Sequence, residues 1–324
     1  MTMADKTFAE IGKIEAIASL FEGSPYKAFE VASFESKGHD SVITHTKALL
    51  EGIDFNLEYF PLPHLGYKSV IAATGELYAS LAVPRTLSVV LGISAKLDFP
   101  QISELWKGIV SAASEHGYEK VSLELEPSRN GLSICISGTG SRDRLTSARR
   151  PRAASKDLIC VSGALGASYL GMQALERRHP LEEYKMIVGS YIKPELSPHT
   201  VSHLKEEEIY PSHSYFVSKG LADAVKRMVR DSGLGAKIYA DKIPFEGNSF
   251  QLGKELDIDP VSAAMNGGDD YRLLLSIPIL QAEKFRRNFQ TFDIIGHLAL
   301  AEVGAVLVSP DGLEHNITAQ GWDN

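Results

Sequence analysis

The chain has 324 residues, of which 44% are hydrophobic and 23% charged, and this is the composition of an ordinary globular protein. At roughly 150 residues per domain, the length is sufficient for two domains. The 33 basic and 41 acidic residues give a net charge of −8, which argues against nucleic acids and anionic membranes as partners, because both attract basic surfaces. We therefore expect the partner to be a small molecule or another protein.

The first half of the chain is predicted to mix helices and strands. Apolar residues at helical spacing predict a short helix over 9–21, and Gly23-Ser24-Pro25 would end it. Apolar periodicity and turn residues predict the further elements of this half. They are a helix over 67–81, a strand buried on both faces over 87–93, an amphipathic helix over 102–116, and two strands over 121–125 and 132–136 that the turn at 127–131 joins as a hairpin.

A segment rich in Gly, Ser, Arg and Ala, without periodicity, separates the two halves of the chain at 138–155. We predict an N-terminal domain over 1–140, a linker over 141–156 and a C-terminal α/β domain over 157–324. The second half begins like an α/β unit. Its predicted elements are a strand over 157–161, a tight turn over 163–166, a helix over 167–178, a helix over 221–229 followed by a stop at Gly233, and a strand over 271–277.

The two cysteines, Cys135 and Cys160, each lie inside an apolar run. We expect both to be buried strand thiols in a reducing compartment, and neither a disulfide nor a zinc site fits their spacing. The N-terminus lacks an apolar segment of signal-peptide length, and no run reaches the roughly 18 apolar residues of a membrane span. These features predict a cytoplasmic protein that does not span a membrane.

Two short motifs and an arginine cluster are candidate ligand sites. The segment 162–166 (Ser-Gly-Ala-Leu-Gly) follows a strand and opens a helix, where backbone N–H groups can hold a phosphate, although a plain connection is the alternative. In the segment 266–270, two glycines and the carboxylates of Asp269 and Asp270 indicate either a ligand loop or an Asp-rich turn. The linker arginines either contact phosphate or are solvated; they are Arg142, Arg144, Arg149, Arg150 and Arg152.

Five segments together resemble the thiamine-monophosphate kinase family, which belongs to the aminoimidazole-ribonucleotide-synthetase-like superfamily. The segments are 49–55, 65–70, 157–163, 267–271 and 318–322, and the resemblance runs over nearly the whole chain from about Gly38. It implies a two-domain α/β (α+β) fold with an N-terminal mixed-sheet domain that forms a homodimer and carries the nucleotide site. It also implies transfer of the γ-phosphoryl group of ATP to thiamine monophosphate, which yields thiamine diphosphate and requires magnesium ions held by carboxylates.

Several positions where the family carries metal-binding acids hold other residues in this sequence. The motif positions are Gly-Asp-Asp on 38–40, Ser-Thr-Asp on 45–47, Asn-Leu-Ser-Asp on 73–76, Gly-Gly-Asp-Thr near 123–126 and Asp-Ile-Ser-Asp-Gly-Leu on 216–221. Non-acidic residues stand at His39, Lys47, Phe216 and Lys219. Carboxylates remain at Asp40, Glu76 and Glu124, and Asp54 stands where the family has a substrate-contacting histidine.

The resemblance assigns a role to each retained or replaced position. It implies catalytic roles for Asp40 and Ser218; nucleotide contacts from Thr46, Lys47, Arg150, Ser218 and Lys219; thiamine-phosphate contacts from Asp54, Asp269 and Trp322; and magnesium ligands at Asp40, Glu76 and Glu124. Relative to the family pattern, Lys47 and Lys219 together change the charge of the site by about four units. If these lysines converge, we expect them to replace magnesium and to receive a phosphate; the alternative is that both point to solvent.

Three functions are compatible with this pattern. The chain is either a working thiamine-monophosphate kinase with a rearranged metal site that needs ATP and magnesium, a catalytically silent paralogue, or another ATP-dependent enzyme of the superfamily with a different substrate. The first hypothesis relies on Asp40, Glu76, Glu124, Ser218 and Asp270. The second needs no cofactor, and it predicts that the chain binds thiamine monophosphate or a nucleotide, or that it partners an active subunit.

Overall fold

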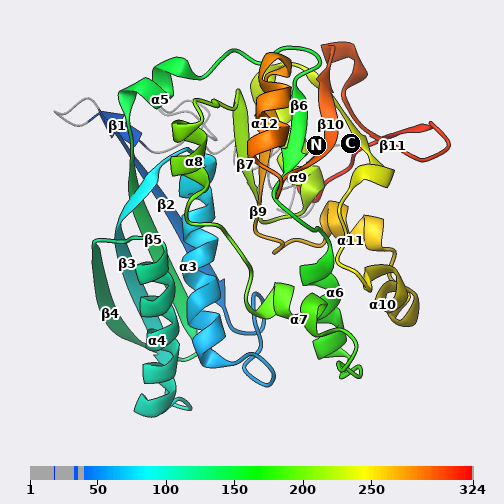
Figure 1. The fold of residues 1–324 in the computed structure, drawn as a ribbon. Helices are drawn as coiled ribbons and strands as arrows, with labels where there is room; N and C mark the ends of the chain where they lie inside the picture. Colours follow the sequence, from blue (N-terminus) through cyan, green and yellow to red (C-terminus); the bar gives the residue numbers. More distant parts are fainter. Residues whose placement is uncertain (1–17, 19–32, 36–39, 323–324) are drawn as a thin grey trace, which may run out of the picture.

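The protein is described by a computed structural model that covers residue 18 and residues 33–35 and 40–322. The helix expected over 9–21, apart from residue 18, and the substituted His39 lie outside these residues. Two mixed β-sheets organise the described chain, and helices pack against both (Figure 1). No helix in the described part of the chain is both long and apolar enough to cross a membrane.

The first sheet has five strands in the order β1-β2-β5-β3-β4. They are β1 (Ser33–Glu35), β2 (Ser41–Leu50), β3 (Val83–Ser94), β4 (Lys120–Ser128) and β5 (Ser133–Arg142). The expected hairpin of β4 with β5 is wrong, because β5 pairs with β2 and β3 instead. The helix α4 (Phe99–Glu115) connects β3 to β4 and lets them pair in parallel, so β5 takes the other edge of β3.

Among the described residues, helices cover one face of the first sheet and not the other. The long helix α3 (Leu62–Ala79) and α4 lie on this face (Figure 1). Leu87 and Leu91 of β3 point toward these helices and are buried. Val90, between them in the alternation of the strand, is exposed, so β3 is buried on one face and not on both as expected. The expectation that Cys135 is buried is wrong for the same reason, whereas Cys160 is buried.

The second sheet has seven strands in the order β12-β11-β8-β10-β6-β9-β7. They are β6 (Leu158–Val161), β7 (His213–Val217), β8 (Gly235–Tyr239), β9 (Arg272–Ile277), β10 (Asp293–Ala299), β11 (Ala305–Val308) and β12 (Glu314–Asn316). The β8–β11 pair is parallel and the others are antiparallel. The strands expected over 157–161 and 271–277 correspond to β6 and β9.

Short helices complete the second half. They are α5 (Arg144–Arg149), α6 (Ala167–Glu176), α7 (Lys185–Ile192), α8 (Thr200–Glu206), α9 (Leu221–Ser232), α10 (Ser249–Leu256), α11 (Pro260–Asn266), α12 (Ala282–Asn288) and the 3₁₀ turns η2 (Ala240–Lys242), η3 (Ile279–Gln281) and η4 (Ala301–Val303). The helix α5 lies inside the segment expected as a linker. As predicted, α9 ends at Gly233, whose φ of 68° lets it cap the helix in the left-handed conformation.

The helix α3 joins the two halves of the molecule. It contacts β2, β3 and β5 of the first sheet and β7 and β9 of the second. A helix that is buried nearly all round needs apolar or small residues on every face, and α3 has Leu65, Ile71 and Leu77 on its buried surface together with Gly75. One hydrophobic core therefore extends from the first sheet through α3 to β6, β7 and β9. The expected two-domain α/β architecture is confirmed.

Candidate functional site

The candidate site lies where α3 meets two loops of the second half. One loop follows β7 and contains Ser218 and Lys219, and the other precedes β9 and contains Asp269. The loops are tied together, because the Asp269 backbone N–H donates to the Ser218 carbonyl at 3.0 Å and the Tyr271 N–H donates to that of Val217 at 2.9 Å. Asp269 and Tyr271 have φ values of 60° and 51°. Such left-handed conformations cost free energy for side chains of this kind and are concentrated at functional loops.

A fully buried lysine binds Asp269. The Lys68 ammonium, on α3, lies 2.9 Å from a carboxylate oxygen of Asp269. Three aromatic rings surround its Nζ atom, with centroids at 3.7 Å for Tyr191, 5.4 Å for Phe60 and 5.6 Å for Tyr271. Burial lowers the pKa of Lys68, and the charge of Asp269 opposes this effect. The aromatic faces and the carboxylate together stabilise a cation inside the protein.

The other carboxylates of the site also face basic side chains of the chain itself. Lys47 of β2 lies 3.7 Å from Asp54, and its side chain is 32% exposed. Arg227 of α9 lies 3.1 Å from Asp223 and 3.8 Å from Glu76 of α3. Each of these acids is therefore compensated by a neighbouring cation.

The C-terminal tryptophan joins the same group. The Trp322 indole N–H donates to Asp223 at 3.0 Å, and the ring is part of the core beside α9. The indole N–H group is therefore already engaged in a hydrogen bond to Asp223 within the protein. The expected contact of Trp322 with a thiamine phosphate stays a prediction.

His45 shows which charges gather at the centre of the site. Burial lowers the pKa of His45, Glu76 opposes this effect, and the charges of Lys47, Arg227 and Lys219 lower the pKa further. All four charged groups are thus close enough to act on one imidazole. The charges of Lys47 and Lys219 thus both reach His45, and their convergence on one phosphate stays a prediction. Lys219 also interacts with another group of the protein.

Phe216 fills the space between α3 and the loop after β7. Its ring is fully buried and stacks on Tyr271 with centroids 5.2 Å apart. A Cβ atom added to Gly75 would overlap this ring, so the glycine on α3 and the phenylalanine on β7 fit each other. In the resembling family these two positions carry a serine and an acid. The aromatic ring therefore stands where the resemblance implies a metal-binding carboxylate.

Asp270 has a structural role at the start of α6. Its carboxylate accepts hydrogen bonds from the backbone N–H groups of Gly166 at 2.9 Å and Ser168 at 3.3 Å, at the start of α6. Burial raises the pKa of Asp270 to about 7, although both N–H donors act in the opposite direction. The helix terminus that the sequence offered as a phosphate site is therefore occupied by a carboxylate of the chain.

The three proposed magnesium ligands do not meet. Asp40 and Lys47 are seven residues apart on one extended stretch, about 23 Å at 3.3 Å per residue. Asp40 lies instead near Lys205, whose pKa is raised by its hydrogen bond to Asp143 and, more weakly, by the Asp40 charge. Glu124 is exposed on β4 and pairs with Val90 on the face that lacks helices, opposite to Glu76. Within residues 40–322, no three His, Cys, Asp or Glu side chains form a group that could hold a metal ion.

The remaining predicted nucleotide contacts are engaged elsewhere. Thr46 points to the face of β2 that lacks helices and its hydroxyl lies 2.9 Å from that of Ser137. The Arg150 guanidinium donates to the carbonyls of Pro211 and Ser212 at 3.2 and 3.3 Å. Arg150 therefore fastens the linker to the start of β7. The described residues present do not fit a magnesium-nucleotide site of the family type.

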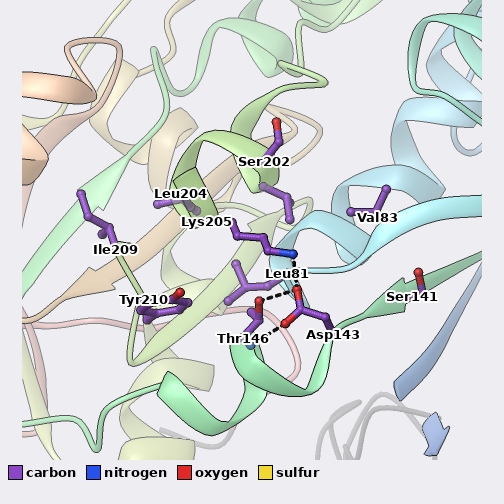
Figure 2. Close-up of a pocket in the computed structure, with 11 residues that line it drawn as sticks. Leu81, Val83, Ser141, Asp143, Thr146, Ser202, Leu204, Lys205, Ile209 and Tyr210 are labelled. Atoms are coloured by element: carbon purple, nitrogen blue, oxygen red, sulfur yellow. Dashed lines mark hydrogen bonds and ion pairs between the residues drawn. The ribbon is translucent and has the colours of Figure 1, made fainter. Parts of the chain in front are cut away.

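Beside the linker lies a small cavity that the sequence did not indicate. It has a volume of about 200 Å³, and Figure 2 shows Asp143, Thr146 and Lys205 at one side of it. Asp143 accepts from the Thr146 backbone at 2.7 Å and pairs with Lys205 at 2.8 Å, so its charge is satisfied within the protein. The rest of the lining is largely apolar, with Leu81 in it, and includes the hydroxyl-bearing Ser141, Ser202 and Tyr210.

Sequence reasoning missed two of the cations that define the site. Lys68 stands inside the resembling segment 65–70, so the resemblance was a signal that could have identified it. No sequence motif marked Arg227. Its charge compensates Glu76 as well as Asp223 because α9 packs near α3, and the sequence does not show this packing.

The fold is similar to that of two-domain α/β proteins that include small-molecule kinases and a hydrogenase maturation protein. A solved thiamine-monophosphate kinase from Aquifex aeolicus superimposes with a TM-score of 0.79 at 20% identity, covering 98% of this chain and 100% of that one. The complex of AaThiL with AMPPCP and TMP gives a TM-score of 0.82 at 20% identity, with 98% of both chains covered. The E. coli hydrogenase maturation protein HypE gives 0.67 at 15% identity, with 86% and 85% covered.

Sequence comparison extends this likeness over the full length. No protein-family model matches the chain. The thiamine-monophosphate kinase of Aquifex aeolicus is 26% identical over 316 residues, which is 96% of this chain and 99% of that protein. That of Pyrococcus horikoshii is 26% identical over 270 residues, 80% of this chain and 78% of that protein. The chain is therefore similar to the thiamine-monophosphate kinases over nearly its full length.

Proposed function

We propose that the chain is a catalytically silent, kinase-like protein that binds thiamine monophosphate or a similar phosphorylated molecule between its two sheets without magnesium. The observation that supports this proposal is the charge balance of the site. Four cations, from Lys47, Lys68, Lys219 and Arg227, accompany four carboxylates, and these are Asp54, Glu76, Asp223 and Asp269. The proposal includes a cytoplasmic location and a homodimer, as the resemblance implies.

Phosphoryl transfer from ATP depends on cations that neutralise the phosphate oxygens, and magnesium supplies most of that charge. A magnesium ion near Lys47 and Lys219 would be repelled, since unit charges about 4 Å apart interact by roughly 4 kcal/mol at an effective dielectric of 20. Removing even one group that stabilises a transition state commonly costs about a hundredfold or more in rate. Efficient magnesium-ATP turnover is therefore not expected.

Binding of a phosphate is expected from the same lysines. The Lys47–Asp54 distance of 3.7 Å is that of a loose pair, and both side chains are partly exposed. A phosphate oxygen can form a shorter, charge-assisted hydrogen bond with such an ammonium group. The charges of Lys47 and Lys219 both influence the His45 imidazole, and the proposal is that one phosphate contacts both lysines.

Calorimetric titration of the purified protein tests the proposal. The ligands are thiamine monophosphate and an unreactive ATP analogue, each with magnesium and with a chelator, in wild type and in Lys219→Glu. We expect binding of thiamine monophosphate with chelator present and its loss in the variant. Magnesium-dependent nucleotide binding followed by turnover would instead establish a working kinase with a rearranged metal site. Absence of binding in every arm would refute the ligand-binding proposal.

A further inference from the structure

A basic hollow lies on the second sheet, at a distance from the site between the sheets. Its floor is formed by β6, β8 and β10, and its walls by α12 and η2; its volume is about 330 Å³. Leu158, at its edge, pairs with Ile277 at the end of β9, whereas the loop with Asp269 precedes the start of that strand. The hollow and the site therefore lie toward opposite ends of β9.

The charged side chains that line the hollow are all basic. They are Lys156, Lys242 and Arg286, and His297 stands beside them. Among the described residues, no carboxylate pairs with these three cations within 4.0 Å. Asp293 lies in the neighbourhood of Arg286, since both act on the pKa of Cys160, but it does not line the hollow. In a chain with a net charge of −8, such a concave cluster produces a local positive potential that attracts anions.

A neighbouring lysine on the same sheet has an acidic partner, unlike the cations of the hollow. Lys237, which lies opposite His297 in the pairing of β8 with β10, forms an ion pair with Glu314 of β12. Lys242 instead lies over the Tyr239 ring, with Nζ 4.5 Å from the centroid. The cations inside the hollow thus lack the counter-charge that the sheet gives to Lys237.

The floor of the hollow can accept a flat or apolar group. Tyr239, Leu158 and Ile294 are on it, and Gly296 leaves it without a side chain at the point where the pairing of β10 with β6 is irregular. The Tyr239 hydroxyl lies 3.5 Å from Nδ1 of His297. A volume of about 330 Å³ is at the lower end of the range of small-molecule sites, roughly 300–1,000 Å³.

We propose that this hollow is a second ligand site, which binds a small phosphate ester of nucleotide size through Lys156, Lys242 and Arg286. The phosphate lies among the three cations, and the rest of the molecule lies on the Tyr239 side of the floor. This site does not depend on the function proposed for the site between the sheets.

Calorimetry with four probes tests the assignment: AMP, ribose 5-phosphate, inorganic phosphate and adenosine. We expect AMP and ribose 5-phosphate to bind to the full-length wild type and adenosine not to bind. The double variant Lys156→Ala/Arg286→Ala removes two of the charge-assisted contacts, so its affinity should fall by at least about tenfold. Arg287→Ala is the matched control, because Arg287 is an exposed arginine on the same helix that does not line the hollow.

Lys219→Glu separates this site from the one between the sheets, and it should leave binding at the hollow unchanged. Circular dichroism confirms that each variant is folded, which is expected because the altered side chains are exposed. The proposal is overturned if no phosphate ester binds to wild type, if the double variant binds as tightly as Arg287→Ala, or if adenosine binds as well as AMP. It is equally overturned if only Lys219→Glu abolishes binding.

Discussion

Lys68 is a charged side chain held entirely inside the protein, whereas its partner Asp269 is 30% exposed. This asymmetry predicts unequal effects of removing either partner. Asp269→Asn leaves a buried ammonium without a counter-ion, and we expect a loss of about 3–5 kcal/mol in the free energy of unfolding. Lys68→Met places an apolar chain among three aromatic rings and leaves a carboxylate that water can reach, so the loss should be smaller. Urea unfolding of both variants checks the order, and the reverse order would contradict it.

His116 predicts a specific dependence of stability on pH. It is 4% exposed at the end of α4, its Nδ1 lies 2.9 Å from the Tyr78 hydroxyl, and burial lowers its pKa from 6.5 to about 4. Because the unfolded chain takes up this proton first as the pH falls, the histidine's contribution is present above pH 6.5 and is lost toward pH 4. The loss approaches about 3 kcal/mol.

Urea unfolding at pH 7, 5.5 and 4.5 measures this contribution by comparing wild type with His116→Asn. The asparagine keeps a polar atom near the Tyr78 hydroxyl and does not titrate, so the difference between the two proteins should shrink as the pH falls. Parallel pH profiles would show that His116 is not responsible.

At the scale of elements, Gly75 and Phe216 fix the distance between α3 and β7. A methyl group at Gly75 would overlap the Phe216 ring, so Gly75→Ala should destabilise the protein by about 1–3 kcal/mol in spite of the better helix propensity of alanine. In the Phe216→Leu background the same substitution should cost less, with a coupling energy of about 0.5–3 kcal/mol.

Gly189→Ala is the control for this double-mutant cycle, because Gly189 also lies in a helix and an added Cβ there would meet no atom within 4 Å. It should be neutral or slightly stabilising. Additive effects of Gly75→Ala and Phe216→Leu in denaturant unfolding would argue against the contact between α3 and β7.

At the scale of the whole molecule, none of the helices within residues 40–322 covers one face of the first sheet. This face carries small or hydroxyl side chains such as Thr46 and Ser137, together with the exposed Val90 and Cys135. The resemblance implies pairing of two N-terminal sheets, and a second copy of this face is the occupant that we expect. Light scattering after size exclusion should show a dimer that Val90→Arg converts to a monomer, because the new charges would be buried in the interface.

Val110→Arg, on the exposed side of α4, is the control and should remain dimeric. Cys135 provides a second readout, since it pairs with Val90 across the sheet. Its thiol should react slowly in the dimer and quickly in Val90→Arg. A monomeric wild type would exclude this use of the face.

Much of the fold was predictable because short-range patterns reflect it. The periodicity of 102–116 and of 221–229, with the stop at Gly233, led to α4 and α9 with errors of only a few residues. Pairing was not predictable in the same way. The hairpin expected for β4 and β5 failed because strand neighbours are chosen by how α4 crosses the sheet, and the exposure of Cys135 depends on which face the helices cover.

For the candidate site too, some features were predictable from the sequence and others were not. The family likeness, the replaced acids at Lys47 and Lys219 and the retained Asp269 are properties of the sequence by itself, because they depend on residue types at motif positions. Only the tertiary structure decided which charges meet. Asp270 caps a helix about a hundred residues earlier in the chain, and Lys68 of α3 pairs with Asp269 about two hundred residues later. Electrostatic interactions depend on distance in space, and residue order along the chain does not specify that distance.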